Sequence, residues 1–253
     1  MQKKNAPSVV VPLPEPRLEH ASGQLGRVAG DDTVQVGDDR PLASQVDECW
    51  LDSLADGLAR DSWLELDLAR HLPEGLVGAL ANEADILNKG EAMAHAGIGR
   101  GREQTNDRSV RRDRIAWLEG VTEPQALLFR FLDQLREGLN RRLFLNLKRY
   151  ESHYATYRPG DFYKCHLDSF RGRASRVVSL VLYLNDDWHM ADGGQLRVFH
   201  PGNESEVAAE VLPQAGRAVL FMSEEVPHEV LPANRTRFSI ACWFRQDEVP
   251  LPL

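Results

Sequence analysis

The sequence is poor in cysteine, has no excess of positive charge and contains no long apolar run. Its three cysteines (Cys49, Cys165 and Cys242) form no CxxC pair, which argues against a disulfide framework and favours a reducing cytoplasm. The net charge of −8 disfavours nucleic acid as a partner, because a phosphate backbone requires a cationic surface. No stretch approaches the roughly 20 apolar residues of a membrane span, and prolines interrupt the short apolar run near the N-terminus. We therefore expect neither a membrane partner nor a signal peptide.

Aromatic residues are missing from residues 1–43, which are instead rich in Pro, Gly and Asp. Such a segment buries too little apolar area to offset the entropy lost on ordering, so we expect a flexible tail. In the remaining sequence, the residue pattern changes once, after about residue 147. We expect a helical support region with the first strands over residues 44–147, followed by a β-rich core over residues 148–247.

Three helices are predicted before the β-rich core. Residues 44–61 have Ser44 as a candidate N-cap with Asp47 three residues later. In residues 72–90, Pro73 suits the first turn and the predicted helix ends before Gly90. Residues 122–144 carry the clearest apolar stripe, which comprises Leu127, Leu128, Phe131, Leu135 and Leu139.

After Leu147, short β-type runs alternate with turn sequences such as RPGD, NDDW and PGN. This spacing is typical of a β-sandwich or barrel. Because the helices come first and the strands later, we predict an α+β fold in which helices pack on one side of an antiparallel core.

Two histidines and one aspartate form a candidate metal site. In the run YKCHLDSF, His166 and Asp168 stand two residues apart, so on a strand they point to the same face. His228, in VPHEVLP, offers a third ligand. Two histidines and one carboxylate can occupy one face of an octahedral Fe(II) and leave the opposite face open for other ligands. The HxD pair alone is a weak signal, since a histidine beside an acid is common on protein surfaces.

Two further polar residues lie in apolar strands. Arg237 follows His228 by nine residues and enters the run RFSIACWF, where an unpaired buried charge would be costly. Tyr183 lies in VVSLVLYLN and needs a partner for its hydroxyl. A carboxylate shared by the two side chains would satisfy both. A salt bridge for Arg237 and plain core packing for Tyr183 are the alternatives.

In this combination the sequence resembles the 2-oxoglutarate- and Fe(II)-dependent dioxygenases, and in particular the prolyl 4-hydroxylases of the hypoxia-inducible-factor type and their bacterial relatives. The motifs that carry the resemblance are RRDRIAWLEG, YRPGDFYKCHLD, YLNDDW, GGQLRVF and PHEVLPANRTRFSIACWF, in order over roughly residues 110–246. The resemblance implies a double-stranded β-helix (jelly roll) core with supporting N-terminal helices. The chain differs from the animal enzymes because no Cys/His zinc module precedes these motifs.

The resemblance also implies roles for individual residues. His166, Asp168 and His228 would bind Fe(II), while Arg237 and Tyr183 would hold the distal carboxylate of 2-oxoglutarate. Tyr157 matches a family tyrosine that lies beside the cosubstrate. Four further positions also match: Trp243 would line the pocket, Asp113 would support it, and Arg112 and Arg176 would lie near the bound peptide. Without the resemblance, Trp243 is better explained as a core residue.

The implied reaction is hydroxylation of a prolyl residue in a protein substrate, with O2 as cosubstrate and succinate and CO2 as further products. Ascorbate is a candidate additional cofactor, and the expected partner is a protein that exposes a proline-containing loop. The alternatives are hydroxylation of a free amino acid or other small molecule, oxidative demethylation of nucleic acid, and a non-catalytic jelly-roll binding module. The absence of a basic stripe disfavours nucleic-acid demethylation, and the complete set of site residues disfavours the non-catalytic binding module.

Six arginines lie between Arg100 and Arg114. They indicate either a solvated loop or a mobile loop that closes over a protein substrate. On the second interpretation, neutralising Arg111 and Arg112 would raise KM for the protein substrate alone. His153, His189 and His200 have no partner at ligand spacing and are expected to be surface or core histidines.

Overall fold

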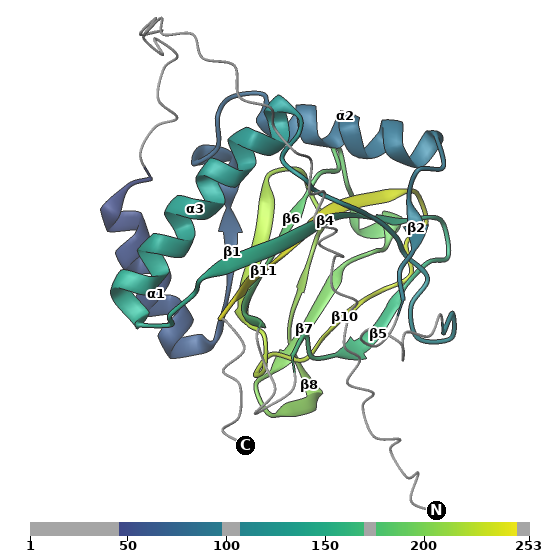
Figure 1. Cartoon of the computed structure of the whole chain (residues 1–253). Helices are drawn as coiled ribbons and strands as arrows, with labels where there is room; N and C mark the ends of the chain where they lie inside the picture. The colour runs from purple at the N-terminus through teal and green to yellow at the C-terminus, as the bar shows by residue number, and fades with distance from the viewer. Residues whose placement is uncertain (1–45, 98–106, 170–175, 247–253) are drawn as a thin grey trace, which may run out of the picture.

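The computed structural model describes residues 46–97, 107–169 and 176–246, and the segment 1–43 expected to be a tail lies outside them. Within these ranges the three predicted helices are confirmed (Figure 1): α1 (Glu48–Asp61), α2 (Leu76–Lys89) and α3 (Glu123–Leu143), together with the 3-10 turns η1 (Leu68–Arg70) and η3 (Met190–Asp192). In the described part of the chain, no helix combines the length and hydropathy that a membrane span requires.

The helix termini correct two details of the prediction. Asp47, not Ser44, caps α1, because its side chain accepts hydrogen bonds from the backbone N–H groups of Cys49 (3.3 Å) and Trp50 (3.1 Å). Ser44 lies outside the described residues. The second helix begins after Gly75 and not at Pro73, whereas the third begins after Thr122 with its proline in the first turn, as predicted.

Eleven strands form two sheets in the described residues. In chain order they are β1 (Trp63–Asp67), β2 (Ala94–His95), β3 (Arg114–Trp117), β4 (Arg149–Tyr157), β5 (Tyr163–His166), β6 (Arg176–Tyr183), β7 (Leu196–His200), β8 (Asn203–Val211), β9 (Arg217–Met222), β10 (His228–Val230) and β11 (Arg237–Arg245). The larger sheet has the order β1-β9-β6-β11-β4-β3-β2, and the smaller has the order β5-β10-β7-β8. Every pair of named strands is antiparallel.

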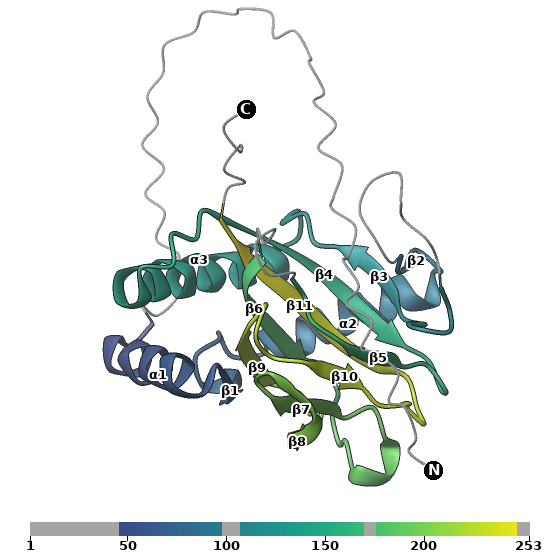
Figure 2. The ribbon, with the colours of Figure 1, turned by 90° about the horizontal axis from the view of Figure 1, so that it is seen from below.

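The helices and sheets form three layers. The three helices cover the outer face of the larger sheet, and the smaller sheet lies on its other side (Figure 2). Side chains from the facing surfaces of both sheets share one buried cluster, in which Tyr183 and Phe221 meet Leu196 and Val230. This arrangement confirms the predicted α+β class and the double-stranded β-helix core.

The main hydrophobic core lies between the helices and the larger sheet. Leu54 of α1, Leu80 of α2 and Leu135 of α3 are buried there against Ile240 and Phe244 of β11. Burial of such side chains contributes roughly 1.5–3 kcal/mol each. This core therefore fixes the larger sheet as a firm support for whatever its opposite face carries.

Candidate functional site

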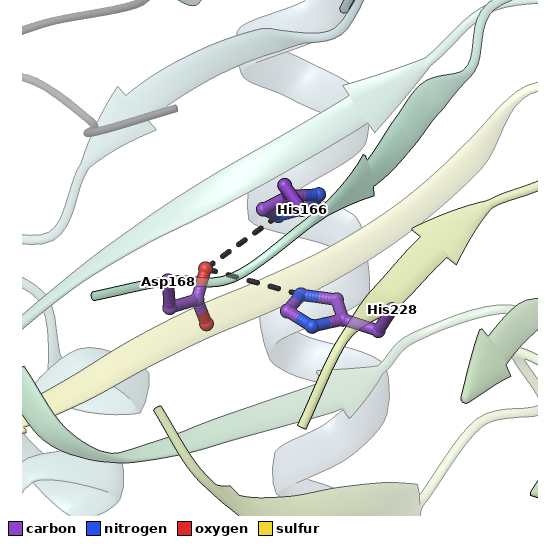
Figure 3. A group of neighbouring side chains, drawn as sticks. All are labelled: His166, Asp168 and His228. Atoms are coloured by element: carbon purple, nitrogen blue, oxygen red, sulfur yellow. Dashed lines mark ion pairs between the residues drawn. The ribbon is translucent and has the colours of Figure 1, made fainter. Parts of the chain in front are cut away.

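The two candidate histidine ligands come from neighbouring strands of the smaller sheet. His166 ends β5 and His228 begins β10, and the antiparallel register places them directly opposite each other. Their ring centroids are 4.3 Å apart. Asp168 follows β5 by two residues and turns toward both rings, with its Oδ1 3.6 Å from Nε2 of His166 and 3.8 Å from Nε2 of His228 (Figure 3). The structure thus brings all three predicted ligands together.

Backbone carbonyl groups fix the orientation of both rings. Nδ1 of His166 lies 2.8 Å from the carbonyl oxygen of Lys164, and Nδ1 of His228 lies 3.0 Å from that of Val226. A carbonyl oxygen only accepts hydrogen bonds, so each Nδ1 carries the proton and each Nε2 presents a lone pair. Both lone pairs are available on the side of Asp168.

These donors fit a divalent metal ion. Among the described residues, His166, Asp168 and His228 can each offer one ligand atom within 4.8 Å of the others, and all three side chains are buried. Two imidazole nitrogens and a carboxylate oxygen form the set found in non-haem Fe(II) sites, and carbonyl groups that hold the histidines are typical supports of metal ligands.

The ionisation states suit ligation as well. Burial alone would raise the pKa of Asp168, but His228, His166 and the Ser179 hydroxyl together hold it well below its usual range. Burial and the neighbouring His166 lower the pKa of His228 to about 4, so this imidazole is neutral at physiological pH. A carboxylate and a neutral imidazole are the forms that bind metal.

Arg237 lies in the same cavity as these ligands, on the facing sheet. It is among the largest fully buried side chains, yet no described carboxylate forms an ion pair with it. Its Nε donates to the carbonyl of Gly194 (2.9 Å) and its Nη1 donates to the Ser239 hydroxyl (3.1 Å). Its Nη2 has no hydrogen-bond partner among the described residues, and neither does the buried hydroxyl of Tyr183. The Tyr183 ring centroid is 5.2 Å from the guanidinium carbon.

Such an arrangement is unfavourable by itself, because a buried charge without a counter-charge costs free energy. The Nη2 donor of Arg237 and the phenol hydroxyl of Tyr183 are both buried and unsatisfied, and together they could bind one anionic group. The shared carboxylate for Arg237 and Tyr183 stays a prediction, and within the described residues Arg237 forms no salt bridge of the alternative kind.

A glycine of the ADGG segment makes room for Arg237. Gly194 has a φ of 67°, and a Cβ at this position would lie 3.0 Å from Cδ of Arg237 and 3.3 Å from Cβ of Ala233. A larger residue would be strained by its backbone conformation and would push the guanidinium aside. This spatial requirement gives a physical reason for the second glycine of the GGQLRVF motif.

The cavity between the two sheets holds about 50 Å³, which exceeds the roughly 10–15 Å³ that one water molecule needs. Its wall includes Tyr157, which pairs with Arg237 across β4 and β11 and lies 4.8 Å from the guanidinium carbon. Trp243 lines it too, whereas Cys242, the next residue back, is buried in the opposite, helix-backed core.

The arginine pair at positions 111 and 112 divides between the inside and the outside. Arg112 is exposed, does not line the cavity and donates to the carbonyl of Arg108 (3.0 Å). Arg111 is buried in the cavity wall, forms an ion pair with Asp113, and lies over the Tyr163 ring at 4.3 Å. The interpretation of Arg111 as a charge on a loop is therefore wrong. Asp113 holds Arg111 in the pocket wall, a role for Arg111 that sequence reasoning missed.

Residues 100–106 of the arginine-rich segment lie outside the described residues. The part that follows runs beside β5: the amide of Lys164 donates to Val110 (2.9 Å) and that of Arg112 donates to Phe162 (3.0 Å). This pairing decides which of the two adjacent arginines faces inward.

Arg176 is buried behind Trp243. Its guanidinium carbon lies 4.1 Å from the tryptophan ring centroid, and its Nε donates to Glu151 (2.8 Å). It does not line the cavity. Any influence of Arg176 on a bound peptide therefore acts through the position of Trp243, because the guanidinium is committed to Glu151.

His153 is a cavity residue that sequence reasoning missed. It pairs with Ala241 across β4 and β11, is buried, and makes edge-on contacts with the rings of Trp117 and Trp243. Its Nε2 has no partner among the described residues. Of the two expected environments, surface or core, it occupies the core, and its strand position, two residues from Ala155 and four from Tyr157, places it on the cavity face.

Comparisons with known proteins agree with this geometry. The profile of the 2OG-Fe(II) oxygenase superfamily matches residues 152–245, a range that contains all three candidate ligands and Arg237. Over 148 residues the chain is 34% identical to the human protein Egl nine homolog 1, which corresponds to 55% of this chain and 34% of that protein. The chain spans between 34% and 43% of the length of the human, rat and mouse forms of that protein.

Solved structures extend the likeness to most of the chain. A prolyl-4-hydroxylase from Pseudomonas putida is 41% identical, with a TM-score of 0.68 over 78% of this chain and 100% of the other. A prolyl hydroxylase from Trichoplax adhaerens, solved with a peptide fragment of a hypoxia-inducible factor, is 25% identical, with a TM-score of 0.69 over 79% of this chain and 90% of the other.

Proposed function

Because the chain belongs to the 2OG-Fe(II) oxygenase superfamily, and within it to the prolyl hydroxylases, we propose that it hydroxylates a prolyl residue of a protein substrate. One observation carries the proposal. Buried Arg237 and Tyr183 leave unpartnered polar atoms in the neighbourhood of a His–Asp–His cluster, between the same two sheets. A site that needed only a Lewis acid would have no use for this second, anion-binding group.

In this proposal, His166, Asp168 and His228 hold Fe(II), and Arg237 with Tyr183 holds the distal carboxylate of 2-oxoglutarate. The Tyr157 ring lies beside the Arg237 guanidinium and would contact the cosubstrate there. When bound, Fe(II) and 2-oxoglutarate supply the oxidising chemistry: one atom of O2 enters the substrate as hydroxyl, the other enters succinate, and CO2 is released. The chain itself binds, orients and excludes water.

Exclusion of water follows from burial. The three metal ligands and Arg237 are all nearly inaccessible, and Trp243 and Tyr163 contribute aromatic surface to the same cavity. An aromatic wall suits the apolar ring of a proline. Since the site lies between two sheets, only a narrow, protruding segment can bring a residue to it. We therefore propose a proline in an exposed loop of a partner protein.

Three finer expectations belong to the same proposal. The enzyme acts in the cytoplasm, its turnover is supported by ascorbate, and neither nucleic acid nor a membrane is its partner. The absence of a disulfide framework supports the cytoplasmic location, and the net charge of −8 disfavours nucleic acid as a partner. Adding and omitting ascorbate in a multiple-turnover assay tests the second.

Arg237→Ala tests the cosubstrate site. Anaerobic titration of 2-oxoglutarate into the Fe(II)-loaded variant should give about 100-fold weaker binding than wild type, since charge-assisted hydrogen bonds contribute about 1.5–3 kcal/mol each. Arg217→Ala is the matched control, because Arg217 is exposed and forms an ion pair only with Glu65 (2.6 Å) within the described residues. Equal affinities for wild type and Arg237→Ala would refute the cosubstrate assignment.

The substrate class needs a separate experiment. Wild-type enzyme, Fe(II) and 2-oxoglutarate are incubated with a cell extract, and peptides are searched for prolines that have gained one oxygen atom. We expect such peptides with wild type and none with Arg237→Ala. Succinate formation without any hydroxylated proline would refute the protein substrate while leaving the oxidative chemistry in place.

A further inference from the structure

The two oxygens of the Asp168 carboxylate have different surroundings. Oδ1 faces Nε2 of His166 and Nε2 of His228 at 3.6 and 3.8 Å, where a shared metal ion would lie (Figure 3). Oδ2 accepts a hydrogen bond of 2.6 Å from the hydroxyl of Ser179, which comes from β6 in the other sheet. One oxygen is therefore directed toward the histidines, and the other is already engaged.

The hydroxyl of Ser179 belongs to a directed chain. Its Oγ lies 2.8 Å from Oγ of Ser223, and both serines are almost fully buried. The carboxylate can only accept, so the single proton of Ser179 goes to Asp168 and Ser223 donates its own proton to Ser179. The order Ser223, Ser179, Asp168 follows from these proton counts.

Ser223 is held in place by the backbone on both sides. Its amide donates to the carbonyl of Val177 (3.0 Å), and its carbonyl accepts from the amide of Ser169 (3.2 Å), the residue after Asp168. The serine chain thus links β6, the end of β9 and the segment that carries the carboxylate. A displaced carboxylate would break a fully buried chain and leave hydroxyl groups unpartnered, which is costly.

We propose that Ser179 is a positioning residue for the metal centre, a role that rests on the proposed function of the site. By holding Oδ2, it makes Asp168 a ligand through Oδ1 alone. A second carboxylate oxygen on the metal would occupy one of the positions that 2-oxoglutarate and O2 require. Ser179 therefore acts on the metal through Asp168.

Metal binding measured with Co(II) tests the role without any substrate. Co(II) is stable in air on the time scale of the titration, and its visible absorption reports coordination number. We expect Ser179→Ala to bind Co(II) about 10–100-fold more weakly than wild type, the range for loss of a residue that supports a metal ligand. The Co(II) absorption of the variant should change because Oδ2 becomes free to coordinate.

Three companion variants separate positioning from packing. Ser179→Cys keeps a side chain of similar shape but is a weak donor, so it should behave like Ser179→Ala. Ser179→Thr keeps the hydroxyl and should restore both affinity and absorption. Ser223→Ala leaves the bond from Ser179 to Asp168 and should give a smaller loss. Thermal unfolding of each metal-free variant identifies any that do not fold.

The inference is overturned if folded Ser179→Ala or Ser179→Cys has the Co(II) affinity and absorption of wild type. This outcome can be told apart from failure of the proposed function. If Co(II) binding depends on Ser179 but the enzyme hydroxylates no proline, the function alone is refuted. If the enzyme is an active prolyl hydroxylase and its Ser179 variants bind Co(II) as wild type does, the positioning role alone is refuted.

Discussion

Strand β11 contributes to both faces of the larger sheet, and its residues change character from one face to the other. Ile240, Cys242 and Phe244 pack against the helices in a continuous apolar core. Arg237 and Ser239, which alternate with them, line the cavity that faces the smaller sheet. The period of two along a strand separates these sets without any change in the backbone.

The two faces also differ in how their polar groups are satisfied. Where a polar side chain enters the helix-backed core, it can find a partner, as the Tyr154 hydroxyl does with Glu83 (2.7 Å). Most of the described buried polar atoms that have no partner belong to the cavity side, on Arg111, His153, Tyr163, Tyr183 and Arg237. One face therefore stabilises the fold, and the other keeps unsatisfied groups that a ligand can satisfy.

Asp168→Ala should break the cavity face alone and have the largest effect. Loss of one of three ligands should reduce turnover at least about 1000-fold, equivalent to about 4 kcal/mol of transition-state stabilisation. The variant should remain folded, because the helix-backed core is untouched. Steady-state succinate release and Co(II) titration measure the loss, and wild-type Co(II) affinity in this variant would contradict the ligand assignment.

Leu135→Ala should break the helix-backed face alone. Leu135 is completely buried in the middle of α3, and removal of its side chain should lower the free energy of unfolding by about 3 kcal/mol, within the usual range for such a cavity. Chemical denaturation of the metal-free protein measures this loss. Folded Leu135→Ala should bind Co(II) as wild type does, and a large loss of Co(II) affinity would show that the two faces are not independent.

His153→Gln should have the smallest effect and sharpen the electrostatic side of the comparison. Burial, with a further contribution from Arg111, lowers the pKa of His153 to about 4, below the value of about 6.5 in an unfolded chain. As the pH falls from 6.5 toward 4, the unfolded chain takes up a proton that the folded protein does not, so stability is lost.

Between pH 7.5 and pH 5 this proton should cost wild type about 2 kcal/mol that His153→Gln does not lose. Urea denaturation at the two pH values measures the difference. The same loss in both proteins would mean that other groups dominate the acid response and that His153 is already protonated or open to solvent at pH 5.

Much of the fold could be predicted because its elements have strong local signals. The apolar stripe of α3, with Thr122 and Pro124 at its start, is readable without tertiary information. Strand β8 is hard to predict from its sequence, NESEVAAEV, because acidic residues and alanine disfavour strands. It is a strand because β7 offers it an edge, and its first residues remain exposed.

The candidate site shows the same division. The sequence shows the spacing of His166 and Asp168. It also shows that Arg237 lies in an apolar strand, where an unpaired charge would cost free energy. The choice between Arg111 and Arg112 was not, because adjacent residues have identical chemistry and only pairing with β5 decides which one turns inward. The cavity position of His153 depends in the same way on its register opposite Ala241.

The sequence by itself determined which residue types were present for a metal and an anion, and it determined the alternation that separates a polar from an apolar face of each strand. Tertiary structure decided which of those residues meet. His166 and His228 are neighbours only because β5 and β10 pair, and Ser179 reaches Asp168 only because the two sheets face each other. The order of residues determines which side chains are available and which face of a strand they occupy, whereas burial of the whole core sets strand register and sheet packing.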